Sequence, residues 1–439
     1  MSDTLTPYVD AFRAFETGLN GQASSPIHQI RRRAIACFEA SGFPTSKDEA
    51  WKSINLSPLT ASYPTATASA TPLSSDALDT VRLGVDGWTI VFVDGFFDEA
   101  SSELSDLPSG LTIASIANEI KAGNSTLSDN ISELADYEDH AFTALNTAFL
   151  TDGAFVHVAR GVVIEKPVHV VYLSTSRDVP SISYPRSLFV ADENSQLTLV
   201  ETFSGMGEGS YVSNHVAEIV VGDNTIVDHY KVGLEGDRAL HVANQKVRQG
   251  RGSNFCSHSF SIGGQFVRND VSSALDGEAC ESTINGLYVL NGAQHCDNYT
   301  LLEHRKPGCP SHELYKGILD GQARAVFRGK ILVHQIAKNT DAYQQNKNVL
   351  LSDDARVNTK PQLEIYADEV KCSHGATIGQ LDDDALFYLQ TRGIGRQAAQ
   401  RMLLEAFAGD VLSRIKIKGL RKALTDIVLN KISGAGESS

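Results

Sequence analysis

Long hydrophobic runs are absent from the 439-residue sequence. No stretch of 18 consecutive apolar residues occurs, so no membrane-spanning helix is expected. Basic residues are also in deficit, because 38 lysines and arginines oppose 53 aspartates and glutamates and leave a net charge of -15. This deficit argues against nucleic acid or an anionic membrane surface as the main partner, since both bind a positive face. The N-terminal residues resemble neither a secretory signal nor a transit peptide, so we expect a cytoplasmic protein.

Cysteine is scarce, and the common catalytic signatures are missing. The sequence has no CxxC pair, and a reducing compartment disfavours a disulfide framework. The thiols are therefore either small buried groups or are used chemically. No GxxxxGK[ST] loop is present, which excludes nucleotide binding through a P-loop, and GxSxG, HExxH and GxGxxG are absent as well. The six cysteines stand at positions 37, 256, 280, 296, 309 and 372.

The residue patterns divide the chain into three regions. Residues 1–150 are predicted to be mostly helical, with a Ser/Thr/Pro-rich connector over 57–80 and a buried strand over 88–97. Residues 151–378 show short runs in which apolar and polar residues alternate, as in β-strands, with no helix-length segment between them. Helical periodicity returns over 379–439. The absence of helical crossovers in the middle region excludes a doubly wound α/β sheet.

A weak repeat in the middle region predicts its architecture. Repeats of 20 to 50 residues indicate a stacked fold, and strands without helices at that period favour a β-solenoid, specifically a β-helix. A large antiparallel sandwich is the alternative. The 44-residue interval is interpreted as an insertion on one face. Similar turn-then-strand phrases are spaced by 29, 28, 27, 44 and 32 residues, and they begin at Glu193, Gly222, Gly250, Gly277, Gly321 and Asp353.

The segment KCSHGAT, residues 371–377, is the main candidate for chemistry. It follows the strand-like run LEIYADEV, and side chains at i and i+2 of a strand point to the same face, so Cys372 and His374 are predicted to project together. A thiolate beside an imidazole suits zinc, iron or an iron–sulfur species. Because a closed tetrahedral site needs four ligands, the others would come from elsewhere, plausibly from another chain.

Other cysteines and histidines are weaker candidates. Cys256 and His258 have the same i, i+2 spacing, but the simpler interpretation is a packed thiol and a hydrogen-bonded strand histidine. Cys37 is expected to lie on an N-terminal helix, near Phe38, and to be buried in the hydrophobic core. Cys280, Cys296 and Cys309 are expected to fill coil interiors, whereas His295, His304 and His312 are expected in solvated loops of the presumed insertion.

Three segments resemble the SufB/SufD iron–sulfur cluster assembly family. Residues 339–394, which contain KCSHGAT, are similar to the C-terminal signature of the family, and residues 311–333 (SHELYKGILDGQARAVFRGKILV) are similar to the segment upstream of it. Residues 42–59 (GFPTSKDEAWKSINLSPL) resemble a segment typical of the SufD branch. Chain length, this segment, and a serine between the cysteine and the histidine favour SufD over its SufB paralogue.

The resemblance implies a fold, partners and a cargo. It implies a right-handed parallel β-helix between helical ends, pairing with a SufB-like paralogue, and binding of a SufC-type ABC ATPase through the C-terminal helices. It places a transient iron–sulfur cluster or iron at the subunit interface, with Cys372 and His374 as its ligands on this chain, and Cys256 is not part of the family motif. The chain is then a non-enzymatic scaffold or accessory subunit, with a homodimer as the alternative when the paralogue is absent.

Three alternatives stay open at this point. The chain is a SufB-like scaffold paralogue, a β-helix enzyme acting on carbohydrate, or an adaptor in which the thiol chemistry is irrelevant. The enzyme would need a carboxylate-lined groove, and the sequence shows no dense cluster of aspartates on one strand.

Overall fold

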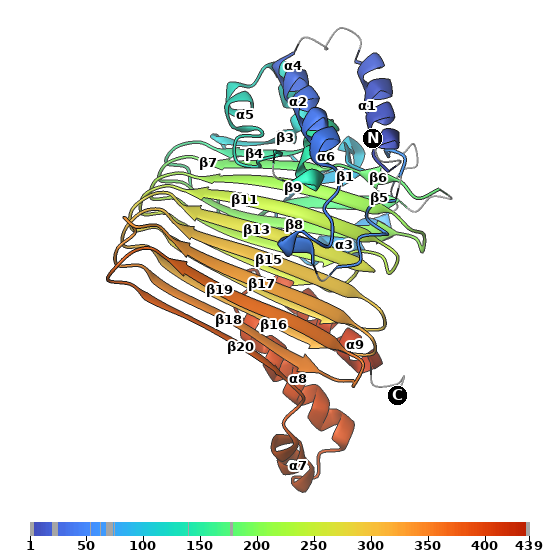
Figure 1. Cartoon of the computed structure of the whole chain (residues 1–439), viewed down its shortest axis with the longest axis vertical. Helices are drawn as coiled ribbons and strands as arrows, with labels where there is room; N and C mark the ends of the chain where they lie inside the picture. Colours follow the sequence, from blue (N-terminus) through green and yellow to red (C-terminus); the bar gives the residue numbers. More distant parts are fainter. Residues whose placement is uncertain are drawn as a thin grey trace.

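The computed structural model describes residues 4–435, except for 20–24, 53, 62, 67–72, 74, 139 and 176–178. The chain forms a stack of β-coils with helices at both ends (Figure 1). The predicted connector lies partly outside the described residues. In its described part, Leu59 is buried and Ser75–Arg82 forms helix α3.

Two ten-stranded sheets form opposite walls of the stack, and from β7 to β20 successive strands of the chain alternate between them. The first sheet contains, in spatial order, β2 (Phe96–Phe97), β1 (Trp88–Val93), β5 (Val168–Thr175), β8 (Gln196–Met206), β10 (Ile226–Leu234), β12 (Asn254–Ser261), β14 (Glu281–Leu290), β16 (Pro310–Leu319), β18 (Asp341–Leu350) and β20 (Lys371–Gly379). The second contains β19 (Arg356–Ile365), β17 (Arg324–Val333), β15 (His295–His304), β13 (Phe266–Leu275), β11 (Leu240–Gln249), β9 (Val212–Val221), β7 (Arg186–Ala191), β4 (Gly153–Val158) and β3 (Leu111–Ser115), with β6 (Ile182–Ser183) beside β9.

Neighbouring strands within each sheet are parallel from β4 to β20, so the antiparallel sandwich is excluded and the predicted β-helix fold is confirmed. Among the described strands, only the pairs β1–β2 and β3–β4 are antiparallel. Parallel strands buried on both faces require cover on both sides. Here each coil supplies one strand to each wall, and the inward side chains of one wall pack against those of the other.

The coil length is nearly constant, and the predicted insertion is wrong. Ser282 of β14 pairs with Ser311 of β16, 29 residues further along, so a regular coil occupies the supposed insertion. The phrase at Gly277 precedes β14 of the first sheet, whereas the phrase at Gly321 precedes β17 of the second. The long interval therefore spans one coil plus the half-turn to the other wall. His295, His304 and His312 accordingly lie in strands β15 and β16 and not in loops.

Helices cover the outer faces of both walls. The N-terminal helices pack on the second sheet through one apolar cluster that joins Phe12, Phe38 and Phe142 to Leu240 and Phe266. These helices are α1 (Thr6–Thr17), α2 (Pro26–Ser41) and α6 (Ala141–Ala148), with the short 3-10 turn η2 (Glu49–Trp51). Helices α4 (Ile116–Ala122) and α5 (Ser125–Asn130) pack on the same sheet through a second cluster, and the 3-10 turn η3 (Glu99–Ser101) contacts β1. The C-terminal helices are α7 (Asp383–Thr391), α8 (Arg396–Leu412) and α9 (Lys418–Ala435).

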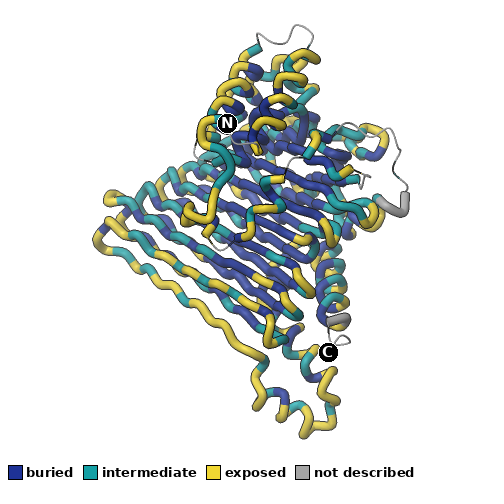
Figure 2. Tube along the Cα trace, turned by 45° about the vertical axis from the view of Figure 1, so that its right-hand side comes forward, coloured by how far each residue is buried: buried dark blue, intermediate teal, exposed yellow. Residues whose placement is uncertain are grey.

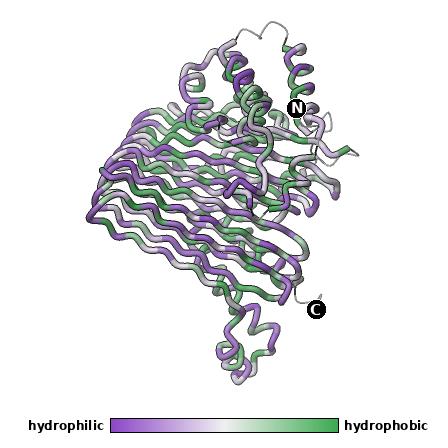
Figure 3. The backbone as a smooth tube through the Cα atoms, in the orientation of Figure 1, coloured by the Kyte–Doolittle hydropathy of each residue, from purple (hydrophilic) through white to green (hydrophobic). Residues whose placement is uncertain are grey.

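Burial decreases toward the C-terminal end of the stack. Middle coils are mostly buried, whereas the last coil, which contains β19 and β20, is mostly exposed (Figure 2). Hydrophilic and hydrophobic residues are interspersed along the coils, so no wall is uniformly apolar (Figure 3). Inward positions of β19 such as Val357 and Leu363 are half-buried because no further coil covers them. The stack therefore ends in an open coil.

Candidate functional site at the open coil

The structure places Cys372 and His374 on β20, the edge strand of the first sheet. Cys372 pairs with Ala342 of β18, and His374 pairs with Gln344. Within the described residues, β20 pairs with no other strand, so its second backbone edge is free to pair. The two residues are separated by one position in a regular strand and lie on the same face, as the spacing predicts.

The two side chains have different surroundings. Cys372 is half-buried and packs against the last apolar cluster of the stack, which identifies its face as the inward one. Burial raises the pKa of its thiol, contact with the backbone of Ala342 lowers it, and the nearby Asp341 raises it again. His374 is exposed at the rim of the open coil. The thiol therefore needs a cation or a proton acceptor to become a thiolate, whereas the imidazole is directly accessible.

A polar column runs inward from His374, and sequence reasoning missed it. Gln344 lies one coil further in and Glu313 two coils in, each in direct register with the next. Both are fully buried, and Nε2 of Gln344 donates to Oε2 of Glu313 at 2.7 Å. Gly329 on the opposite wall leaves room for this contact, since a Cβ there would lie 2.2 Å from Nε2 of Gln344. Polar groups thus extend from the open coil into the stack.

Cys256 and His258 also meet, but in a different place. On β12, the Sγ of Cys256 and Nε2 of His258 are 3.2 Å apart, and the imidazole stacks on Tyr230 at 5.0 Å. Burial raises the pKa of Cys256 to about 12 and lowers that of His258 to about 3, so the pair is a neutral thiol and a neutral imidazole. Lys416, from the loop between α8 and α9, hydrogen-bonds to the hydroxyl of Tyr230 beside them.

The C-terminal helices α8 and α9 lie along the outer face of the first sheet. Their apolar residues, among them Val411, Leu420 and Leu424, join Tyr230 and Phe260 in one buried cluster. Lys316 of β16 bonds to Asp410 and to the carbonyl of Phe407, which fixes α8 to the sheet. On the outer side, a groove of about 340 Å³ separates the two helices and is lined by Glu405, Ala408, Gly409, Leu412, Ser413, Arg421, Thr425 and Leu429.

Comparison with known proteins identifies the family. The family model described as "SUF system FeS cluster assembly, SufBD core domain" matches residues 172–407, and that of the "SufBD protein N-terminal region" matches residues 2–170. The chain belongs to the SufBD family. It is therefore a protein of the SUF system for iron–sulfur cluster assembly, whose members act as assembly scaffolds or accessory proteins rather than as enzymes. Family membership decides against the carbohydrate-active alternative.

Similar proteins cover nearly the whole chain. An iron–sulfur cluster assembly SufBD family protein of Synechocystis is 32% identical over 93% of this chain and 92% of its own. The iron–sulfur cluster assembly protein SufD of Escherichia coli is 32% identical over 99% of this chain and 98% of its own. SufD of Bacillus subtilis is 28% identical over 67% of this chain and 68% of its own. In the described part of this SufBD chain, no helix combines the length and apolarity needed to cross a bilayer.

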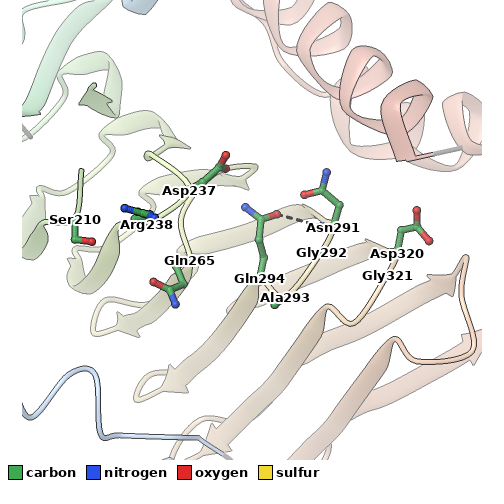
Figure 4. Close-up of a pocket in the computed structure, with 10 residues that line it drawn as sticks. All are labelled: Ser210, Asp237, Arg238, Gln265, Asn291, Gly292, Ala293, Gln294, Asp320 and Gly321. Carbon is green, nitrogen blue, oxygen red and sulfur yellow. Dashed lines mark hydrogen bonds between the residues drawn. The ribbon is translucent and has the colours of Figure 1, made fainter. Parts of the chain in front are cut away.

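Side chains that could bind a metal ion are not gathered into a larger group in the described part of the chain. Across the described ranges, no three His, Cys, Asp or Glu side chains are placed to hold one ion. A hollow of about 620 Å³ at the coil corners contains neither Cys372 nor His374 (Figure 4). Its Gln294 already accepts from the backbone N–H of Asn291 and from Lys431. This hollow is built from turns and offers no thiol or imidazole ligand.

For the remaining cysteines and histidines, the structure confirms some of the predicted burial and corrects the rest. Cys280, Cys296 and Cys309 are fully buried inside the coils, as predicted. Cys37 is only half-buried, because it lies at the margin of α2 while its neighbour Phe38 occupies the core. His304 was predicted to be solvated, but it is fully buried and bonds to Ser311 at 2.9 Å. His295 is half-buried and His312 is exposed, both in strands.

The burial of Glu313 predicts that the free energy of unfolding depends on pH. Burial raises its pKa to about 7, against smaller lowering effects from Thr300 and Gln344, so the folded chain holds a proton that the unfolded chain has lost above pH 4.5. Stability is therefore lost as pH rises from the unfolded toward the folded pKa. We expect Glu313→Gln to match the parent at pH 5 and to exceed its free energy of unfolding by on the order of 3 kcal/mol at pH 8.

Urea denaturation at the two pH values measures this difference. Glu278→Gln, on an exposed turn, is the matched control and should leave the pH dependence unchanged. A parent and a Glu313→Gln variant with parallel pH profiles would show that Glu313 is ionised in the folded chain.

Proposed function

We propose that this chain is a SufD-like accessory subunit that pairs with a SufB-like paralogue and completes an iron or iron–sulfur site at their interface. The observation that carries the proposal is the placement of Cys372 and His374 side by side on the free edge of the open coil. Two ligands do not close a coordination sphere, and the edge strand is where a second chain can add its own. The length of the match to E. coli SufD supports the SufD-like assignment.

The surface around the open coil supports pairing with another chain. Large apolar side chains are exposed there in unusual number for a protein surface. They lie on or beside the last coil, on α7, which extends beyond it, and at one position of α8 (Figure 1). These residues are Tyr343, Ile365, Tyr366, Ile378, Phe387, Tyr388 and Met402. A second solenoid placed against this end would bury them and bring its own ligands toward Cys372.

Each ligand has a distinct role in this proposal. Cys372 supplies a soft sulfur ligand, and because burial raises its pKa, iron binding would displace its proton. His374 supplies an exposed nitrogen ligand that can receive iron first. The chain itself performs no covalent step. Iron and the nascent cluster are cargo that leaves with the acceptor protein.

We further propose that a SufC-type ATPase docks on the outer side of the C-terminal helices. The inner sides of α8 and α9 are occupied by the first sheet, so a partner would dock on their outer side, where the groove between them lies. Glu405 and Arg421 are exposed on its two sides. Removing residues 395–439 would uncover the apolar face of the sheet, so point variants are a cleaner test than truncation.

We expect Arg421→Glu to reduce capture of the ATPase by about tenfold, because it reverses a charge in the groove without touching the buried cluster. The measurement is the amount of ATPase retained on the tagged full-length chain at low and high salt. Lys422→Glu is the matched control, since Lys422 is exposed on the same turn but does not line the groove. Equal loss for both variants would indicate a general charge effect and would exclude the groove.

The partner assignment has its own test. Coexpression of the tagged chain with a SufB-like paralogue and the ATPase, followed by native mass spectrometry, should give a complex with one copy of each SufBD protein. The SufB-like alternative predicts that the chain instead forms a stable homodimer with ATPase and accumulates a cluster without a paralogue.

A further inference from the structure

One corner of the solenoid repeats a common turn before six strands of the first sheet, β8, β10, β12, β14, β16 and β18. In six coils a residue with positive φ is followed directly by a small residue that carries a hydroxyl or thiol. The left-handed residues are Asn194, Asn224, Gly252, Ala279, Gly308 and Asn339. The residues that follow them, and that stack from coil to coil, are Ser195, Thr225, Ser253, Cys280, Cys309 and Thr340.

The hydroxyl groups at these positions donate hydrogen bonds to backbone carbonyls at the same corner of the solenoid. Ser253 donates to the carbonyl of Gly250 at 2.7 Å, and Thr340 donates to that of Ala337 at 2.8 Å. Cys280 makes the equivalent bond, with Sγ 3.1 Å from the carbonyl of Gly277. Because a thiol is a weaker donor than a hydroxyl, serine would serve the turn at least as well. The turn itself does not explain two successive cysteines.

The two thiols are close enough to react with one another. Their Sγ atoms are 3.6 Å apart, and both side chains are fully buried. They stand two residues before the paired Ser282 and Ser311, so they face each other across adjacent coils. Neighbouring strands are about 4.8 Å apart, which lies inside the Cα separation that a disulfide accepts. Each sulfur needs to move by less than about 1 Å to reach bonding distance.

We propose that Cys280 and Cys309 form a redox-modification site, in which hydrogen peroxide converts the two thiols into a disulfide between consecutive coils. The thiolate of one cysteine attacks one peroxide oxygen, the O–O bond breaks, and a sulfenic acid and hydroxide form. The thiol of the other cysteine then attacks this sulfur, the S–S bond forms, and the S–O bond breaks to release water. Overall, two thiols lose two electrons and two protons, and peroxide is reduced to two waters.

The contact between the two sulfurs favours ionisation of one of them. It is the largest cause that lowers the pKa of Cys309, and either sulfur can be the donor in it. Whichever thiolate reacts first, the other thiol resolves the sulfenic acid. The adjoining turn residues Glu278, Ala279 and Gly308 are exposed, so local opening of this corner admits a small uncharged oxidant.

The disulfide would join the coils next to the open end. Each coil of a solenoid contacts only its neighbours, so fraying can proceed coil by coil from an uncapped end. Cys309 precedes β16. This strand pairs with β18, and β18 pairs with the last strand, β20. A covalent link between β14 and β16 would stop fraying two strands inside the site of Cys372.

The test uses the reduced full-length chain treated with hydrogen peroxide. After catalase quenching, free thiols are alkylated in denaturant, and peptides are mapped by mass spectrometry with and without dithiothreitol. We expect a linked peptide that contains Cys280 and Cys309, and a higher midpoint of thermal unfolding that dithiothreitol reverses. In Cys280→Ser, dimedone should trap a sulfenic acid on Cys309. Because serine occupies the equivalent corner in other coils, these variants should fold.

Cys296→Ser is the matched control, since Cys296 is buried without a second thiol in contact and its loss should leave the linked peptide unchanged. If Cys280 and Cys309 both remain open to alkylation after Cys37 and Cys372 are oxidised, the proposal is overturned. It is equally overturned if Cys280→Ser and the parent show the same peroxide-dependent rise in unfolding midpoint.

Discussion

Replacing Cys372 with alanine is expected to lower the iron and acid-labile sulfide content of the coexpressed complex by roughly tenfold, while leaving its subunit composition intact. The reason is geometric. The thiol lies at the uncovered end of the stack, so its loss removes a ligand without opening a cavity inside the fold. His374→Ala should lower the iron content similarly, because the imidazole is the exposed member of the pair.

Ser373→Ala is the matched control for both variants. Ser373 lies between the two ligands on the opposite face of β20, so it shares their backbone environment but not their direction. Cys372→Ser separates sulfur chemistry from shape, since it keeps the size of the side chain and loses the soft ligand. Unchanged cluster content in both Cys372→Ala and His374→Ala would remove the pair from the proposed function and leave the chain as an adaptor.

The sequence predicted the solenoid because its corners repeat a physical requirement. In six coils a residue with positive φ is followed by a small polar residue at the same corner. The sequence shows this repeat in segments such as GDNT, GRGS and GEAC. The same requirement explains why the 44-residue interval was interpreted wrongly. A corner leading to the second wall, at Gly321, also needs positive φ, so a half-turn was interpreted as an insertion.

The polar column could not be predicted in the same way. In β18 the residues after Tyr343 are polar on both faces, in the run QQNKN, so alternation does not show which of them point inward. A shift of one residue in register would exchange the two faces. Glu313 is also separated from His374 by two coils, and only the stacking places them in one line. The shared face of Cys372 and His374 needed only local strand geometry, and was therefore predictable.

Replacing Arg186 with methionine is expected to cost about 3–5 kcal/mol in the free energy of unfolding, because it leaves a buried carboxylate without its cation. Nη2 of Arg186 and Oε2 of Glu218 are 2.6 Å apart, and both side chains are fully buried. Glu218 also accepts the backbone N–H groups of residues 132, 134 and 135, so it ties the N-terminal segment to the second sheet. Urea denaturation of the full chain measures the loss.

The exposed pair Arg251–Asp223 provides the matched control. Its charged atoms are 3.8 Å apart, with the side chain of Arg251 65% exposed, so Arg251→Met should change stability by less than about 0.5 kcal/mol. Adding Glu218→Gln to Arg186→Met should recover part of the loss, since the unpaired charge is then removed while an acceptor for the backbone remains. If Arg186→Met is as mild as Arg251→Met, the ion pair does not hold the N-terminal region to the solenoid, and the other contacts of that region must do so.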